Sequence, residues 1–138
     1  ITGPNHSGAT LHGFLSYLVK ASLKMKKYDL IGYKGKQVRD NLHSYDLVNC
    51  FWQFYKKPRN GEIYNIGGGR YSNCSILEAL NLVEEITNVK IRRKILNTPR
   101  VGDHIWYISD TSKFKKHYPK WKQKFNTKKI IEELIESQ

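Results

Sequence analysis

Residues 32–48, GYKGKQVRDNLHSYDLV, combine a tight turn, a short strand, an isolated arginine and the start of a helix, and the rest of the chain is organised around them. The Lys-Gly pair at 34–35 predicts a turn after the short apolar run that ends at Tyr33. The chain is then expected to double back into a strand at 37–39. This strand would hold Arg39 on ordered backbone, where its planar guanidinium suits a phosphate.

A helix is expected to follow this strand. Ser44 can cap its N-terminus, and Asp46 lies in its first turn, where the helix dipole favours negative charge. One apolar face is expected, made by Leu47, Val48, Phe51, Phe54 and Tyr55.

The remaining elements follow from apolar spacing. Helices are expected over residues 11–27, 75–86, 111–118 and 127–135, with strands over 62–66, 89–95 and 104–108. Ser75 and Glu78 have the spacing of a capping box. Because helices alternate with single short strands, we expect a mixed α/β fold, with residues 1–138 forming one unit whose few strands make a poor sheet alone.

The composition fits one folded domain but leaves its partner open. The chain has 138 residues, of which 39% are hydrophobic, and a net charge of +12. This charge attracts polyanions in general, so a basic module for nucleic acid or another polyanion is one hypothesis. Many lysines fall at expected helix ends, where a solvated surface is the simpler interpretation, and no nucleic-acid-reading motif is present. Nucleic acid is therefore not the favoured partner.

The cysteines, histidines and apolar runs limit the function further. Cys50 and Cys74 have no CxxC partner, which suits a reducing compartment, and we expect a cytoplasmic protein. The five histidines lack ligand spacing, so no metal is expected. No apolar run approaches a membrane span, so no membrane partner is expected. The chain begins at Ile1 and its single methionine is Met25, so we interpret it as a fragment.

Two features invite an anion site. The triplet Gly67–Gly69 could expose backbone N–H groups to a phosphate, but the spacings of the known phosphate loops are absent, and a sharp strand-to-helix turn is favoured. Arg39 and Arg100 lie in separate irregular or strand-end segments and could clamp a diphosphate between them. They could equally form local surface ion pairs with Asp40 and Asp103, and the residues alone leave both interpretations open.

Several motifs together resemble the C-terminal half of extended short-chain dehydrogenases/reductases that act on nucleotide sugars, the NAD-dependent epimerase/dehydratase family. The motifs are Gly35-x-Gln37-x-Arg39-Asp40, Tyr64-Asn65-Ile66-Gly67, the Ser75/Glu78 pair, Arg100-x-Gly102-Asp103 and Asp110-x-x-Lys113. Longer strings at 1–8, 32–41, 67–75 and 102–106 are similar to the CDP-paratose 2-epimerase branch of that family.

The resemblance implies a substrate-binding portion of a Rossmann-type enzyme without the NAD-binding part. It implies that Arg39 and Arg100 hold the substrate diphosphate, that Asp103 takes the ribose and that Ile31 lies on a strand along the nucleobase. Gln37 completes the substrate-binding set. No catalytic, cofactor-binding or metal-binding residue is expected within the chain.

The reaction that the resemblance implies is NAD-dependent epimerisation of a CDP-linked sugar through transient oxidation at C2, with a role in polysaccharide biosynthesis. A 4-epimerase, dehydratase or reductase with the same layout is the alternative. Because the NAD loop and the catalytic tyrosine–lysine pair of the family lie upstream, this chain alone is expected to be inactive. We expect the full-length enzyme to be a homo-oligomer, and we expect residues 41–55 and 62–66 to leave apolar surface exposed here.

Overall fold

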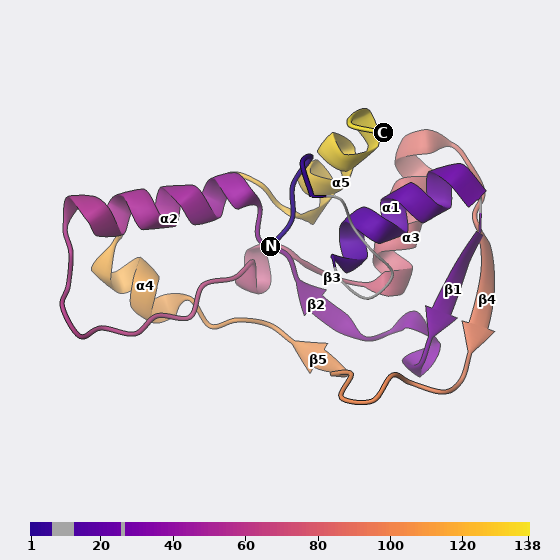
Figure 1. The fold of residues 1–138 in the computed structure, drawn as a ribbon, viewed down its shortest axis with the longest axis horizontal. Helices are drawn as coiled ribbons and strands as arrows, with labels where there is room; N and C mark the ends of the chain where they lie inside the picture. Colours follow the sequence, from indigo (N-terminus) through magenta and orange to yellow (C-terminus); the bar gives the residue numbers. More distant parts are fainter. Residues whose placement is uncertain (7–12, 26) are drawn as a thin grey trace.

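The computed structural model describes residues 1–6, 13–25 and 27–138, and these form a mixed α/β fold (Figure 1). The helices are α1 (Phe14–Met25), α2 (Ser44–Lys56), α3 (Ile76–Thr87), α4 (Ser112–His117) and α5 (Thr127–Glu136), with 3-10 turns η1 (Tyr33–Gly35) and η2 (Gly69–Tyr71). The strands are β1 (Lys27–Ile31), β2 (Val38–Asp40), β3 (Asn73–Ser75), β4 (Arg92–Leu96) and β5 (Trp106–Tyr107). The predicted fold class is confirmed, whereas the strand expected at 62–66 is wrong, because this segment pairs with no other described strand. The expected helix start at residue 11 lies outside the described residues.

The strands form two small sheets with non-local pairing. β1 pairs with β4 in parallel, while β2 lies between an antiparallel β3 and a parallel β5. The hairpin expected across residues 34–35 is therefore wrong, because η1 turns the chain with a positive φ at Lys34 and sends β2 into the other sheet. Strand β2 is the central strand of its sheet, which fixes Arg39 from both sides.

The larger core lies where α1, α3 and α5 pack beside the β1–β4 sheet, at one end of the molecule (Figure 1). Its fully buried side chains come from the apolar stripes of these three helices and include Leu18, Val19, Leu80, Val83, Ile130 and Leu134. The predicted capping box at the start of α3 is confirmed, since Ser75 Oγ accepts from Glu78 N and Ser75 N donates to Glu78 Oε2. Local sequence signals thus fix α3, and burial fixes its place.

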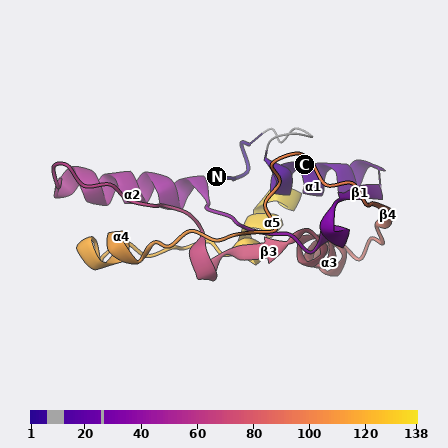
Figure 2. The same ribbon diagram turned by 90° about the horizontal axis from the view of Figure 1, so that it is seen from below.

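A smaller core joins α2 to α4 at the other end of the molecule. Both views show these two helices side by side and away from the larger core (Figures 1 and 2). The buried residues are Leu42, Cys50, Phe114, Tyr118 and Trp121. The indole of Trp121 donates to the carbonyl oxygen of Asp46 at 2.9 Å, which ties the chain after α4 to the first turn of α2.

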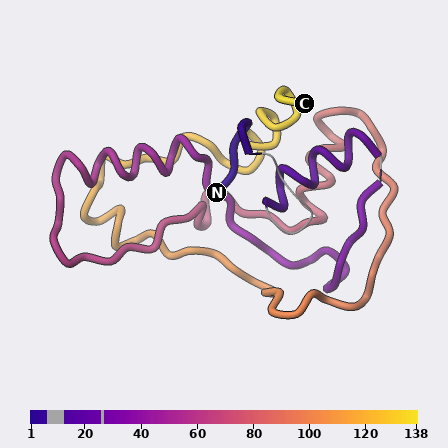
Figure 3. Tube along the Cα trace, viewed as in Figure 1, coloured from indigo at the N-terminus to yellow at the C-terminus, as the bar shows by residue number. Residues whose placement is uncertain are grey.

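Asp46 is fully buried, which the sequence did not predict. Its carboxylate accepts hydrogen bonds from the backbone N–H groups of Lys124 and Phe125 at 2.9 and 3.1 Å. It therefore anchors the connection to α5 in addition to lying in the first turn of α2. The trace in Figure 3 shows this connection crossing back from the α4 end towards α5.

The cap of α2 also differs from the prediction. His43, not Ser44, occupies the N-cap, and its Nδ1 atom accepts from Tyr45 N at 3.0 Å. Its Nε2 atom bonds to Glu133 of α5 at 2.8 Å, and its ring stacks on Phe125. Since a cap of this kind depends on contacts distant in sequence, Ser44 was the better local candidate but is not the residue used.

The apolar face of α2 is only partly buried. Leu47 and Cys50 face the smaller core, whereas the outward side carries Val48, Phe51, Trp52 and Tyr55, each more than half exposed. The predicted face therefore mixed inward and outward residues. The expected exposure of apolar surface on this segment is present in the structure. Among the described helices, none has the length and apolarity that a membrane span requires.

Candidate functional site

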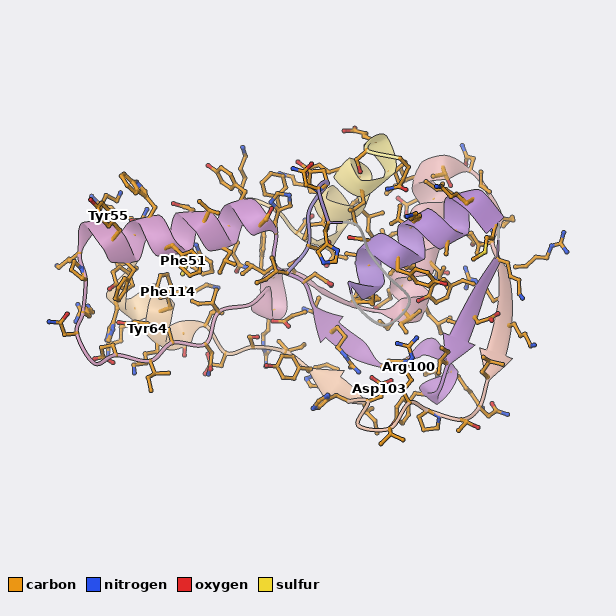
Figure 4. The ribbon with its side chains drawn as sticks, in the orientation of Figure 1. Phe51, Tyr55, Tyr64, Arg100, Asp103 and Phe114 are labelled. Carbon is orange, nitrogen blue, oxygen red and sulfur yellow. The ribbon has the colours of Figure 1, made fainter. Side chains whose placement is uncertain are left out.

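All five residues predicted to bind substrate line one cavity of about 530 Å³. The residues are Ile31, Gln37, Arg39, Arg100 and Asp103. They come from the end of β1, from β2 and its approach, and from the turn that follows β4. Figure 4 shows Arg100 and Asp103 near each other in the lower part of the view, between strands β2 and β5 on one side and strands β1 and β4 on the other. The structure therefore brings together segments that lie far apart in the sequence.

Arg39 is held in place by two contacts. Its Nη1 atom donates to the carbonyl oxygen of Val38 at 2.8 Å, and its Nη2 atom donates to Asp103 Oδ1 in an ion pair. Both side chains of the pair are 21% exposed, so the cavity is open to solvent at this point. The alternative of a local ion pair between Arg39 and Asp40 is not the one observed, because Asp40 accepts hydrogen bonds from Gly69 and Ser109.

The turn that carries Arg100 and Asp103 is fastened to the end of β1. Gly32 donates from its N–H to the carbonyl oxygen of Leu96 at 2.7 Å and has a φ of 68°. A Cβ at this position would lie 2.7 Å from the Cα of Pro99, so the close approach of the two segments requires glycine. Asp103 N then donates to the Arg100 carbonyl at 3.1 Å and closes the turn.

Gln37 links the cavity wall to β1. Its Nε2 atom donates to the carbonyl oxygen of Ile31 at 2.8 Å, and since a carbonyl only accepts, this contact fixes which end of the amide faces Ile31. The Oε1 atom is buried and has no hydrogen-bond partner among the described residues. Gln37 is 3% exposed, so it acts as a fixed part of the wall.

Tyr28 also lines the cavity and was not predicted from the sequence. Burial raises the pKa of its hydroxyl to about 12, against the opposing effect of the positive charge of Arg100. Along β1, Tyr28 and Leu30 alternate with exposed residues, so both point inward. This period of two could have identified Tyr28 as a core residue, whereas its place in the cavity wall depends on segments that are distant in the sequence.

The glycine triplet does not form a phosphate loop. The N–H of Gly69 donates to Asp40 Oδ2 at 2.9 Å, and Ser109 N donates to the same oxygen at 3.0 Å. A carboxylate of the chain thus occupies the place that an anion would need. A Cβ on Gly68 would lie 2.3 Å from the backbone oxygens of Asn41 and Ser72, so glycine serves close backbone packing here.

The sequence contains one Tyr-x-x-x-Lys spacing, from Tyr118 to Lys122, although a pair of this kind was expected only upstream of the chain. Pro119 follows the end of α4, so this pair does not share a helical face. The Tyr118 side chain is buried, and its hydroxyl donates to the carbonyl oxygen of Lys57 at 2.9 Å. The pair is structural and does not alter the expectation that no catalytic residue lies in the chain.

The thiols and the possible metal ligands show no further site. Burial raises the pKa of Cys50 to about 11 and that of Cys74 to about 12, so both thiols stay protonated at neutral pH. Across residues 1–6, 13–25 and 27–138, no three histidine, cysteine or acidic side chains gather as metal ligands would. The cavity around Arg39 is thus the best candidate for function. It combines two guanidinium groups, carboxylates and a hydroxyl, which suits an anionic ligand with hydroxyl groups.

The chain is similar in sequence to proteins of one family. Residues 1–67 match the model of the NAD dependent epimerase/dehydratase family. The chain is 26% identical over 131 residues to CDP-paratose 2-epimerase of Salmonella typhi, covering 90% of this chain and 38% of that protein. It is 31% identical over 116 residues to UDP-arabinose 4-epimerase 1 of Arabidopsis thaliana, covering 83% of this chain and 27% of that protein.

Solved structures show the same fold. A dTDP-glucose 4,6-dehydratase from Bacillus anthracis in complex with NAD superposes with a TM-score of 0.75 at 25% identity, over 91% of this chain and 38% of that one. A UDP-glucuronic acid 4-epimerase from Bacillus cereus, in complex with UDP-glucuronic acid and NAD, gives 0.78 at 22% identity, over 91% and 39%. These findings confirm the resemblance, and the chain is related to the NAD dependent epimerase/dehydratase family. It spans well under half the length of these relatives.

Proposed function

We propose that this chain is the nucleotide-sugar-binding part of an NAD-dependent epimerase and that its ligand is CDP-linked. The observation that carries the proposal is the convergence of Arg39, Arg100 and Asp103 on one cavity whose wall includes Ile31 and Gln37. Two guanidinium groups from separate segments suit a diphosphate, and a carboxylate suits the hydroxyl groups of a ribose.

The particular reaction proposed is that of a CDP-paratose 2-epimerase. The support is the 26% identity to the Salmonella typhi enzyme over nearly the whole chain. A 4-epimerase or a dehydratase is the alternative, because relatives with these activities share the fold. In either reaction this chain would bind and orient the nucleotide so that the sugar is positioned for chemistry.

NAD is the proposed cofactor of the complete enzyme, and it would supply the hydride acceptor and donor when bound. The residues described here do not fit NAD as a resident group. The N–H of Gly69, the natural anion donor in the glycine triplet, is already bonded to Asp40. We therefore assign no step of hydride transfer to this chain, and we propose that it does not turn over substrate alone.

Isothermal titration with CDP and with UDP tests the proposal. We expect CDP to bind the chain more tightly than UDP, and binding to be lost in the Arg39→Ala, Arg100→Ala double variant. A matched control is Arg70→Ala with Arg92→Ala, which removes the same charge from two exposed positions outside the cavity. Equal binding by both double variants would contradict a specific clamp.

The salt dependence of the same titration separates the clamp from a general polyanion surface. The net charge of +12 would favour a polyanion at low ionic strength. A surface that tracks many phosphates loses affinity steeply with salt, while a site for one diphosphate loses much less. A steep loss, together with binding of CDP that persists in the Arg39 and Arg100 variant, would favour the polyanion alternative.

A further inference from the structure

Tyr28 has an unusual position in the cavity. The residue is 8% exposed, and its ring makes a tilted contact with the ring of Tyr17, at 6.1 Å between centroids. Its hydroxyl makes no hydrogen bond to another described residue, and it is not among the polar atoms sealed from solvent, unlike Oε1 of Gln37. Because the residue lines the cavity, a ligand bound there would lie beside Tyr28.

Among the charged groups that act on Tyr28, the positive charge of Arg100 has the largest effect. Arg100 lines the same cavity, and its positive charge acts on Tyr28. The nearest acid on the same strand, Asp29, is already paired with Lys27 at 3.5 Å. Since the pKa of Tyr28 is raised to about 12, the hydroxyl keeps its proton at neutral pH and can only act there as a neutral donor or acceptor.

We propose that the hydroxyl of Tyr28 donates a hydrogen bond to a phosphate oxygen of the nucleoside diphosphate held by Arg39 and Arg100. This inference rests on the proposed function and adds a third donor to the clamp. A phosphate oxygen is the suitable acceptor, because a hydrogen bond from O–H to an anionic oxygen is stronger than one to a neutral group. Tyr28 would be a positioning residue for substrate and takes no part in proton transfer.

Titration of the full chain with inorganic pyrophosphate tests this role without any contribution from base or sugar. In Tyr28→Phe we expect the affinity for pyrophosphate to fall about tenfold, the size expected for one hydrogen bond to a charged acceptor. The matched control is Tyr17→Phe, which removes the same group from a neighbouring ring of the same cavity and is expected to stay within about twofold of wild type. Affinity unchanged in Tyr28→Phe, or equally reduced in both variants, would overturn the inference.

The melting temperature without ligand is a second measurement. Because the Tyr28 hydroxyl has no partner in the described chain, Tyr28→Phe should melt at the wild-type temperature, so a loss of affinity would report a lost ligand contact. A lowered melting temperature would instead assign the hydroxyl a structural role and overturn the inference.

The outcomes for the inference and for the proposed function are distinguishable. Wild-type protein that binds no pyrophosphate would overturn both. Binding that is lost in the Arg39→Ala, Arg100→Ala variant but kept in Tyr28→Phe would leave the clamp standing and remove Tyr28 from it.

Discussion

Asp103 holds the guanidinium of Arg39 although the two residues lie 64 positions apart in the sequence. The Nη2 atom of Arg39 donates a hydrogen bond to Asp103 Oδ1, while its Nη1 atom donates to the carbonyl oxygen of Val38. A carboxylate of the chain therefore occupies part of the guanidinium that the proposed diphosphate would use. When the nucleotide binds, the guanidinium of Arg39 would have to bond both Asp103 and the diphosphate, or the Asp103 carboxylate would have to move away. In the second case the carboxylate could accept hydrogen bonds from the hydroxyl groups of the ribose.

The first prediction concerns Asp103→Asn, which removes the negative charge from Arg39. We expect the affinity for inorganic pyrophosphate to rise about threefold. The reason is that the Asp103 carboxylate competes with the ligand for Arg39, and at this partly exposed site the substitution weakens that competition. The affinity for CDP should rise less or fall, since the carboxylate proposed to bind ribose is also lost. Isothermal titration with the two ligands in parallel gives the comparison.

Asp29→Asn is the control for Asp103→Asn, because Asp29 lines the same cavity but is paired with Lys27 at the edge of β1. Its effect on the ratio of pyrophosphate to CDP affinity should be small. A fall in pyrophosphate affinity in Asp103→Asn would show that the carboxylate orders Arg39 for binding and does not compete with the ligand.

The features that the sequence predicted best are those that depend only on residues close together in the chain. The capping box of Ser75 and Glu78 is complete within four residues, so it could be identified without knowing the fold. The N-cap of α2 could not, because His43 depends on Glu133 and Phe125 from the other end of the chain. The parallel pairing of β1 with β4 is likewise non-local, and a turn signal after β1 suggested a hairpin instead.

In the candidate site, too, some features were predicted from the sequence and others were not. The five residues placed in it came from motif spacing and family resemblance, and the structure brings all of them to one cavity. The sequence did not show that Asp103 pairs with Arg39 in place of its neighbour Arg100, or that Asp40 bonds Gly69 and Ser109. These partners meet because β2 pairs with β5 and lies beside the glycine segment, and spacing along the sequence does not encode this arrangement.

A second prediction concerns how much the buried carboxylate of Asp46 contributes to the stability of the fold. Asp46→Ala leaves the N–H groups of Lys124 and Phe125 without an acceptor inside the protein. We expect the free energy of unfolding to fall by about 3 kcal/mol, the range for breaking a buried charged hydrogen-bond network. Urea denaturation measures it, with exposed Asp110→Ala as the control that should cost far less. Equal losses in the two variants would contradict the anchoring role of Asp46.

A third prediction concerns how the stabilisation provided by Glu84 depends on pH. The N–H of Ile91 donates to its carboxylate and lowers its pKa below the ordinary value of 4.5, and Arg93 adds a favourable charge. A carboxyl with a lowered pKa in the folded state stabilises the fold above the unfolded value, and this contribution is lost as the pH falls through the folded value. Glu84→Gln should thus lower the melting temperature at pH 7 by about 3 °C.

The difference between Glu84→Gln and wild type should shrink as the pH falls below 4.5, because wild type then loses the same charge. Thermal melts followed by circular dichroism at a series of pH values give the curve. Glu85→Gln is the control, since this exposed neighbour contacts only Lys128 among the salt bridges of the described residues. A difference that stays constant with pH would show that Glu84 acts through packing and not through its charge.

The last prediction concerns the exposed outward side of α2. Phe51 and Tyr55 are 60% and 73% exposed on one helix with other apolar neighbours, and a contiguous apolar surface of this kind drives association. We expect the mass measured by light scattering to rise with protein concentration at physiological salt. Phe51→Lys with Tyr55→Lys should shift the chain towards monomer, whereas Met25→Lys with Val101→Lys, which adds the same charge at isolated exposed positions, should not. A chain that stays monomeric at every concentration and melts cooperatively would show that this surface needs no partner for the isolated chain to be stable.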